Sequence, residues 1–142
     1  MKKSILIIIF ILLTVSSYAG KYSTTVNAAD EYGNTPLSTA IYNENLDMIK
    51  LLLNNKMDPN TVTDEYYGTT LFMWAISRDD NELAKLLIKK GVNVNSLNYQ
   101  NLSVLGYTQN TETIKFLLNN GLDPNATDGN GNTPLMMGIL LG

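Results

Sequence analysis

Apolar and polar positions alternate in blocks along this chain. Three short apolar clusters, at residues 48–53, 83–88 and 113–118, are separated by stretches rich in Asn, Asp, Thr and Gly. An N-cap type of residue precedes each cluster, followed two positions later by an acid and five positions later by Lys. These caps are Asn45, Asp80 and Asn110. The shared register predicts three equivalent helices.

The polar stretches repeat as well. Asp30-Glu-Tyr-Gly-Asn-Thr-Pro-Leu37 returns as Asp128-Gly-Asn-Gly-Asn-Thr-Pro-Leu135, and weaker copies lie at 64–72 and 98–105. Asp-x-x-Gly predicts a tight turn, because Gly tolerates a positive φ. Thr-Pro predicts a helix start, with Thr as the N-cap and Pro at the first helical position. A first helix is therefore expected from Pro36 to about Asn43.

The helix that contains each apolar cluster should end before a left-handed residue. Gly91 and Gly121 suit that position, whereas the first copy has Lys56 there, which should cost about 1 kcal/mol. An anchor asparagine also recurs with spacings near 33 residues. Its four copies are Asn27, Asn60, Asn95 and Asn125.

This unit resembles the ankyrin repeat, whose motif runs Asp-x-x-Gly-x-Thr-Pro-Leu, then Ala, then Leu-Leu-Leu, then Gly-x-Asp-x-Asn. The resemblance covers residues 27–142 and implies an all-α solenoid, in which each repeat has a β-hairpin finger and two antiparallel helices. About three and a half repeats are expected after a lead-in at 20–29. Their ranges are 30–63, 64–97, 98–127 and, in part, 128–142.

The copies are uneven. Repeat three has lost about one turn of its first helix and contains Gly106, so it should be the least stable repeat. Trp74 is expected in the core between repeats. In repeat four, the first helix should expose Leu135, Ile139 and their apolar neighbours. We expect either a longer stack beyond this face or a partner on it, including end-to-end self-association.

The first 19 residues have the pattern of a cleaved signal peptide. Lys2 and Lys3 precede nine consecutive apolar residues, Ile5–Leu13, and small residues end the segment at Ser17-Tyr18-Ala19. An uncleaved anchor is the competing interpretation, but it needs about 20 apolar residues. The mature chain is therefore expected to be exported, either to a bacterial periplasm or outside the cell.

Composition narrows the possible chemistry. The chain has no Cys and no His, which excludes disulfides, thiolate or imidazole metal sites and His-dependent nucleophiles. The net charge is −3, and it becomes −5 once Lys2 and Lys3 are removed. This balance disfavours nucleic acids and anionic membrane surfaces as partners. No cofactor and no metal are expected.

Two acidic groups could be read as chemical sites. Asp128–Asn132 resembles the start of a calcium loop, but Thr133 and Ile139 stand where an EF-hand needs Gly and Glu. Asp79, Asp80 and Glu82 could supply the paired carboxylates of a hydrolase. Asp80 and Glu82 are already explained as a cap and a dipole partner, which leaves Asp79 without a role.

The resemblance also implies a concave binding face made of fingertips and inner-helix residues. The matching positions here are Tyr32, Asn34, Tyr42, Asn43, Tyr66, Tyr67, Thr69, Ser77, Arg78 and Tyr99. Tyrosine is enriched at binding hot spots. The alternative is that these residues are only wetted by solvent, in a sequence biased toward Asn, Ile, Lys and Tyr. The expected function is a non-enzymatic scaffold that binds an unidentified protein; a passive segment of a longer envelope stack and a carboxylate-dependent hydrolase are the alternatives.

Overall fold

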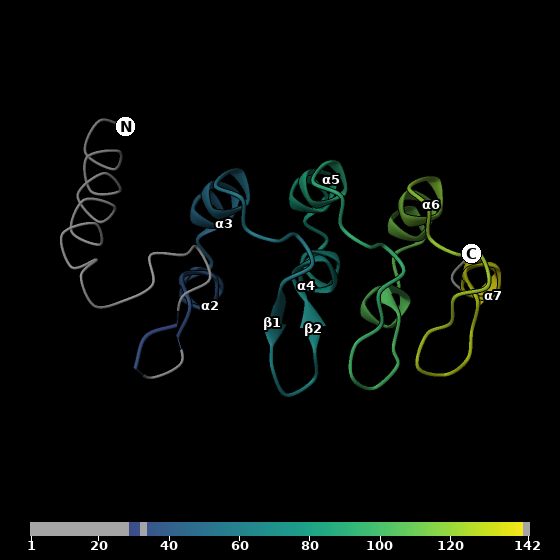
Figure 1. The fold of residues 1–142 in the computed structure, drawn as a ribbon. Helices are drawn as coiled ribbons and strands as arrows, with labels where there is room; N and C mark the ends of the chain where they lie inside the picture. Colours follow the sequence, from purple (N-terminus) through teal and green to yellow (C-terminus); the bar gives the residue numbers. More distant parts are fainter. Residues whose placement is uncertain (1–28, 32–33, 141–142) are drawn as a thin grey trace.

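The computed structural model describes residues 29–31 and 34–140, which form a row of helix pairs (Figure 1). The predicted signal peptide and Tyr32 lie outside the described residues. One row of helices carries the finger loops and is called the inner row here; the other is the outer row. The inner row contains α2 (Pro36–Tyr42), α4 (Leu71–Ser77), the 3₁₀ helix η1 (Val104–Tyr107) and α7 (Pro134–Leu140). The outer row contains α3 (Leu46–Asn54), α5 (Asn81–Lys89) and α6 (Thr111–Asn119).

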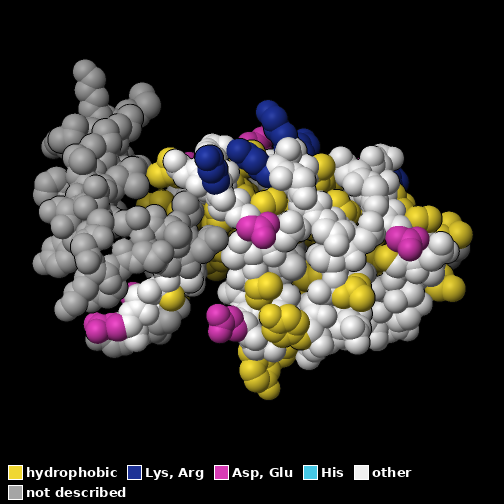
Figure 2. All heavy atoms as spheres, in the orientation of Figure 1, with side chains coloured by type: hydrophobic (Ala, Val, Ile, Leu, Met, Phe, Trp, Pro, Cys, Tyr) yellow, Lys and Arg dark blue, Asp and Glu magenta, His cyan; other side chains and the backbone are white. Residues whose placement is uncertain are grey.

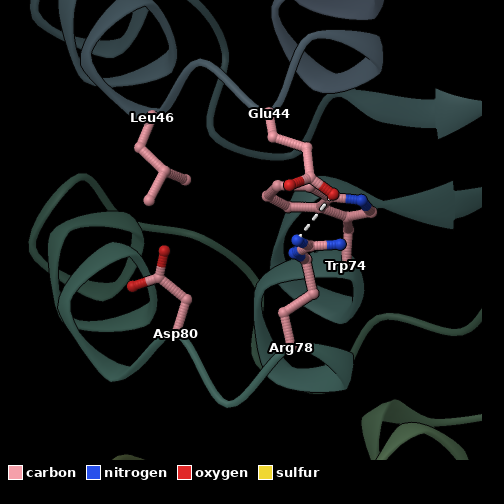
Figure 3. Close-up of a pocket in the computed structure, with 5 residues that line it drawn as sticks. All are labelled: Glu44, Leu46, Trp74, Arg78 and Asp80. Carbon is pink, nitrogen blue, oxygen red and sulfur yellow. Dashed lines mark hydrogen bonds and ion pairs between the residues drawn. The ribbon is translucent and has the colours of Figure 1, made fainter.

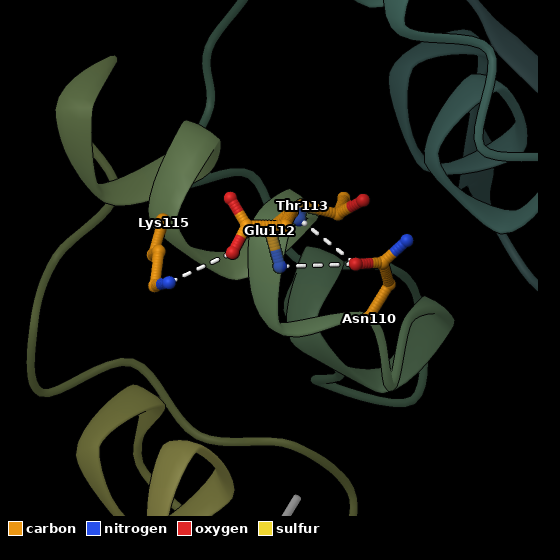
Figure 4. A network of polar contacts seen from close by, with 4 residues as sticks. All are labelled: Asn110, Glu112, Thr113 and Lys115. Carbon is orange, nitrogen blue, oxygen red and sulfur yellow. Dashed lines mark hydrogen bonds and ion pairs between the residues drawn. The ribbon is translucent and has the colours of Figure 1, made fainter. Parts of the chain in front are cut away.

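The predicted helix starts are confirmed atom by atom. In the inner row, the Thr35 hydroxyl accepts the amide of Ser38 at 3.0 Å, with Pro36 first in the helix. In the outer row, Asn110 Oδ1 accepts the amides of Glu112 and Thr113 at 2.9 and 3.4 Å (Figure 4). Asn45 and Asp80 cap α3 and α5 in the same way. Each cap satisfies amides that the first helical turn cannot bond internally.

The helix ends also follow local rules. Gly91 and Gly121 have φ values of 85° and 93°, and Lys56 occupies the same position with a φ of 69°. Lysine carries a Cβ that disfavours this left-handed conformation, so the first repeat holds a strained residue where the next two hold Gly.

Between α3 and α4 the chain forms the one regular finger among the described residues. Strands β1 (Val62–Asp64) and β2 (Thr69–Thr70) pair antiparallel, with a register shift between Val62 and Asp64. The copy of the motif at 64–72 is one residue longer than Asp30–Leu37, and this extra residue lies in the same finger. Fingers three and four turn through the same Asp or Asn geometry without a strand pair.

The apolar core runs along the row rather than around one centre. It is densest at α4, where Leu71, Phe72, Met73, Ala75 and Ile76 are all at most 1% exposed. In repeat three the shortened first helix is η1, a single 3₁₀ turn that still buries Val104 and Leu105. The predicted loss of helix in repeat three is therefore confirmed.

The last inner helix leaves an apolar face uncovered. Leu135 and Met136 are exposed and Met137 is buried, while the side chain of Ile139 lies outside the described residues. An open groove of about 400 Å³ lies between α6 and α7, lined by Ile114, Leu118, Pro124, Pro134 and Leu135 among others. Across the described part of the chain, no helix has both the length and the apolar character needed to span a bilayer.

Candidate interaction surface

Each finger is closed by one acidic or amide side chain at its first position. Asp128 Oδ1 accepts the amides of Asn130 and Asn132 at 2.8 and 2.9 Å, and Asp128 Oδ2 accepts the Asn132 side chain. These bonds, led by the one from the Asn132 side chain, lower the pKa of Asp128. Asp30 binds Asn34 in the same way. The segment that resembles a calcium loop therefore uses its carboxylate to hold a finger.

In finger three, the side-chain amide of Asn98 takes the place of the aspartate found in the other fingers. Asn98 is buried; its Oδ1 accepts the amides of Gln100 and Leu102, each at 2.9 Å, and its Nδ2 donates to the Tyr107 hydroxyl at 2.9 Å. That hydroxyl also lies 3.2 Å from Thr69 Oγ1 in the neighbouring finger. Tyr107 thus joins repeats two and three, a role that sequence reasoning did not assign to it.

The predicted tyrosines differ in what they contact. Tyr66, Tyr67 and Tyr99 lie together on fingers two and three: the rings of Tyr66 and Tyr67 meet edge to face at 4.7 Å, and the Tyr99 amide donates to the Tyr67 carbonyl at 2.9 Å. Tyr42 lies apart, at the end of α2, and is 88% exposed. The structure therefore brings three of the five candidate tyrosines into one surface.

The side chains of several other predicted contact residues form hydrogen bonds within the chain. Asn34 binds Asp30, Asn43 donates to the Thr39 carbonyl at 2.8 Å, Ser77 donates to the Trp74 carbonyl at 2.8 Å, and Thr69 meets Tyr107. These bonds help to form the surface, and they reduce what the four side chains can offer to a partner.

Arg78 belongs to a small pocket between repeats one and two (Figure 3). Its guanidinium carbon lies 5.2 Å from the centre of the Trp74 ring, and its Nη2 donates to Glu44 Oε1 at 2.8 Å. Leu46 and Asp80 complete the lining of this pocket, which has a volume of about 360 Å³. The prediction for Trp74 needs correction: the ring packs against the core but is only partly buried, because one side faces this pocket.

The proposed hydrolase carboxylates have structural uses. Asp80 Oδ1 caps α5, and Glu82 lies in the first turn of that helix. Asp79, which had no local role, accepts the Thr113 hydroxyl at 3.1 Å and lies 3.5 Å from the Asn110 amide nitrogen of the next repeat. Glu44 occupies the equivalent turn in repeat one and likewise reaches the next repeat, through Arg78. Both acids therefore connect neighbouring repeats.

The recurring asparagine also connects repeats. Asn60 Oδ1 accepts the amide of Asn93 at 2.8 Å, and Asn95 Oδ1 accepts the amide of Asp123 at 2.7 Å. Asn95 also donates to the Gly121 carbonyl at 2.9 Å. The periodic spacing marked these residues as equivalent, but their acceptors and donors lie in the next repeat and could not be read from one copy.

Within residues 29–31 and 34–140, no three Asp or Glu side chains gather in a way that could hold an ion. The described residues form a row of fingers. Fingers two and three are joined by hydrogen bonds and carry exposed tyrosines.

Two matches to known families cover most of the sequence. Residues 8–98 match ankyrin repeats (3 copies), and residues 102–141 match ankyrin repeats (many copies). The chain belongs to the ankyrin-repeat family. The predicted solenoid of ankyrin repeats is thereby confirmed, and ankyrin repeats are generally protein–protein interaction modules. The first match begins within the segment predicted to be a signal peptide, and that prediction stays a prediction.

Relatives from distant organisms show the same similarity. An ankyrin repeat protein of Fowlpox virus (strain NVSL) is 32% identical over 125 residues, which is 87% of this chain and 18% of that protein. An ankyrin repeat protein of Acanthamoeba polyphaga mimivirus is 32% identical over 85 residues, 60% of this chain and 22% of that protein. A protein of Dictyostelium discoideum named as a probable serine/threonine-protein kinase is 34% identical over 121 residues, 78% of this chain and 14% of that protein. This ankyrin-repeat chain thus spans less than a quarter of the length of these relatives.

Proposed function

We propose that this ankyrin-repeat chain is a non-enzymatic scaffold that binds another protein through its fingers and inner helices. The observation that carries the proposal is the cluster of exposed tyrosines on fingers whose backbone is fixed by hydrogen bonds. Rigid aromatic side chains give a large contact area at a low entropy cost. Of the three neighbouring carboxylates, Asp80 caps α5, Asp79 contacts the next repeat, and Glu82 lies in the first turn of α5.

We also propose that the chain acts outside the cytoplasm. The support is the sequence of residues 1–19, with its basic start, its short apolar run and its small residues before the expected cleavage position. Expression with the native N-terminus, followed by fractionation and N-terminal sequencing, tests this proposal. Export with a new terminus at residue 20 is expected, and an uncleaved chain that stays in the cytoplasm would contradict it.

Affinity capture tests the binding surface. The chain from residue 20 onward is immobilised and exposed to envelope and culture-medium proteins, beside a bait in which Tyr66 and Tyr67 are both replaced by Ala. A partner that binds the fingers should be retained by the first bait and lost, by about tenfold or more, from the second. Lys85→Ala on α5, in the outer row, serves as the matched surface control. If both baits retain every captured protein equally, the surface is assigned wrongly.

A passive segment of a longer stack is the second candidate, and the groove between α6 and α7 favours it. In register with the earlier repeats, this is where the outer helix of repeat four would pack, and the exposed Leu135 lines the groove. Sedimentation across protein concentrations tests whether this face packs against a second copy of the chain. A dimer that Leu135→Glu disrupts supports end-to-end association, whereas a monomer at all concentrations contradicts it.

A further inference from the structure

Three exposed tyrosines lie on the neighbouring fingers two and three: the Tyr66 and Tyr67 rings touch, and Tyr99 is joined to Tyr67 through a backbone hydrogen bond. Tyr66 is 81% exposed, Tyr99 68% and Tyr67 45%. We call these three residues, together with the exposed Glu65, the tyrosine patch. Figure 2 shows hydrophobic side chains gathered at the tip of the β1–β2 finger, with an acidic side chain beside them. Large exposed aromatic side chains on a soluble domain mark sites of interaction.

The backbone under the tyrosine patch is fixed by hydrogen bonds before a partner binds. Gly68 is buried beneath the Tyr99 ring, and a Cβ at this position would clash with that ring. The Tyr99 amide bonds to the Tyr67 carbonyl, and the Tyr66 amide bonds to Asp64 Oδ1 at 2.9 Å. Because these bonds fix the backbone of both fingers, little order has to be gained on binding.

The charge around the patch has one sign. The finger segments 30–35, 60–70, 95–103 and 125–133 contain no Lys and no Arg in the sequence. Their acids are Asp30, Glu31, Asp64, Glu65 and Asp128. The lysines instead follow the outer row, on or just after α3, α5 and α6, where Figure 2 shows most of the basic side chains. A partner approaching the fingers therefore meets aromatic rings in a negative field.

Elsewhere the same chain holds an arginine between an aromatic ring and a carboxylate. At the pocket between repeats one and two, the Arg78 guanidinium lies over an aromatic ring, Trp74, and bonds to a carboxylate, Glu44. The tyrosine patch offers rings and a carboxylate but has no basic residue of its own in its finger segments. Guanidinium groups stack on aromatic rings and pair with carboxylates more readily than other side chains do.

We propose that the tyrosine patch binds a basic segment of the partner protein, in which an arginine side chain stacks on the tyrosine rings and pairs with Glu65. The inference rests on the proposed function, because it names the chemistry of the partner for the same surface. An acidic partner segment would be repelled by the fingers, and a purely apolar one would leave Glu65 without a counter-charge.

A set of matched peptides tests the inference. The probe is a short Gly/Ser peptide with three spaced arginines, compared with one in which citrulline replaces each arginine and one in which Glu does. Binding to the chain from residue 20 onward is measured by fluorescence anisotropy and by amide chemical shifts. The arginine peptide should bind and shift signals at 64–68 and 98–101, and its affinity should fall as salt rises. The citrulline and Glu peptides should not bind.

Variants locate the contact. Replacing Tyr66 and Tyr99 with Ala should weaken the arginine peptide about fivefold or more, and Glu65→Gln about two- to fivefold. Asp47→Asn on α3 removes the same charge from the outer row and should leave the affinity within about twofold. Replacing the same tyrosines with Phe keeps the rings and should keep most of the binding, which separates loss of contact from loss of folding.

Distinct outcomes overturn the inference. Equal binding of the citrulline peptide, shifts confined to other residues, or equal losses for Asp47→Asn and Glu65→Gln would each show that the patch does not recognise an arginine side chain. If a captured partner is lost from the Tyr66/Tyr67 bait while the arginine peptide fails to bind, only this inference fails. If capture is also insensitive to the fingers, the proposed function fails with it.

Discussion

Repeat two builds its inner helix from five side chains in α4 that are at most 1% exposed, whereas repeat three has only the single turn of η1 in the same place. In repeat three, hydrogen bonds compensate in part for the smaller apolar core. Tyr107 joins Asn98 to Thr69, and the Ser103 hydroxyl donates at 2.6 Å to the Thr127 carbonyl, at the start of finger four. A lost helical turn is tolerated because a solenoid needs only that each repeat satisfy its two neighbours.

The largest expected effect comes from emptying the core of repeat two. Phe72 is fully buried in α4, so Phe72→Ala should lower the free energy of unfolding by about 3–5 kcal/mol. Val104→Ala in η1 removes less apolar volume and should cost about 2 kcal/mol. Urea titration measures both, with the exposed Lys85→Ala on α5 as a control that should change little. Equal losses at Phe72 and Val104 would show that repeat three depends on its apolar core as much as repeat two does.

The next effect tests the polar junction of repeats two and three. Tyr107→Phe keeps the ring but removes the hydroxyl that bonds the buried Asn98 and Thr69, so it should cost about 1–2 kcal/mol. Tyr66→Phe removes a hydroxyl from a side chain that is mostly exposed and should cost almost nothing. If the two variants unfold at the same urea concentration, the Tyr107 hydroxyl does not hold the junction together.

A smaller effect compares the helix ends of repeats one and two. Lys56→Gly should raise the free energy of unfolding by about 0.5–1 kcal/mol, because Lys56 has a φ of 69° and Gly adopts it without strain. Gly91→Ala is the reverse change at the equivalent position, where an added Cβ would meet no atom within 4 Å. It should therefore lose about as much as Lys56→Gly gains. A gain at one site without a loss at the other would point to a contact of the Lys56 side chain.

The smallest effect is a difference between finger four and finger three in how their amide exchange depends on pH. Hydrogen bonds keep the pKa of Asp128 below the 3.8 of an unperturbed aspartate. A lowered pKa means that these bonds stabilise finger four fully above pH 3.8 and are lost as the pH falls through the lower folded value. The protection of the amides at 128–132, corrected for the intrinsic exchange rate at each pH, should therefore fall in acid, while the protection at 98–102, held by Asn98, should not follow a titration. The Asp128→Asn variant should lose the acid dependence of finger four.

Most of the fold could be predicted because its signals are local. Thr35, Asn45, Asp80 and Asn110 cap helices through amides two to three residues away, so one copy of the motif suffices to recognise them. The same is true of the left-handed Gly91 and Gly121. The reduced first helix of repeat three was likewise expected from the sequence, because this copy of the unit is about one helical turn shorter.

The candidate surface was predicted only in part. The fingertip positions of Tyr66, Tyr67 and Tyr99 followed from the motif, but their clustering depends on the Tyr99 ring lying over Gly68 in the neighbouring finger. Arg78 was expected to face a partner, and the structure bonds it to Glu44, 34 residues away in the chain. Sequence distance conceals such pairs, because the spacing of a repeat says which residues are equivalent and not which ones touch.

By itself, then, the sequence determined the repeat unit, its caps and its turns, since these depend on backbone geometry within a few residues. Tertiary structure alone decided how the repeats are joined. Asn60 and Asn95 reach the next repeat, Asp79 reaches Thr113, and Tyr107 reaches Thr69. Each of these bonds links groups more than 20 residues apart, so it exists only when stacking has set the distance and angle between two neighbouring repeats.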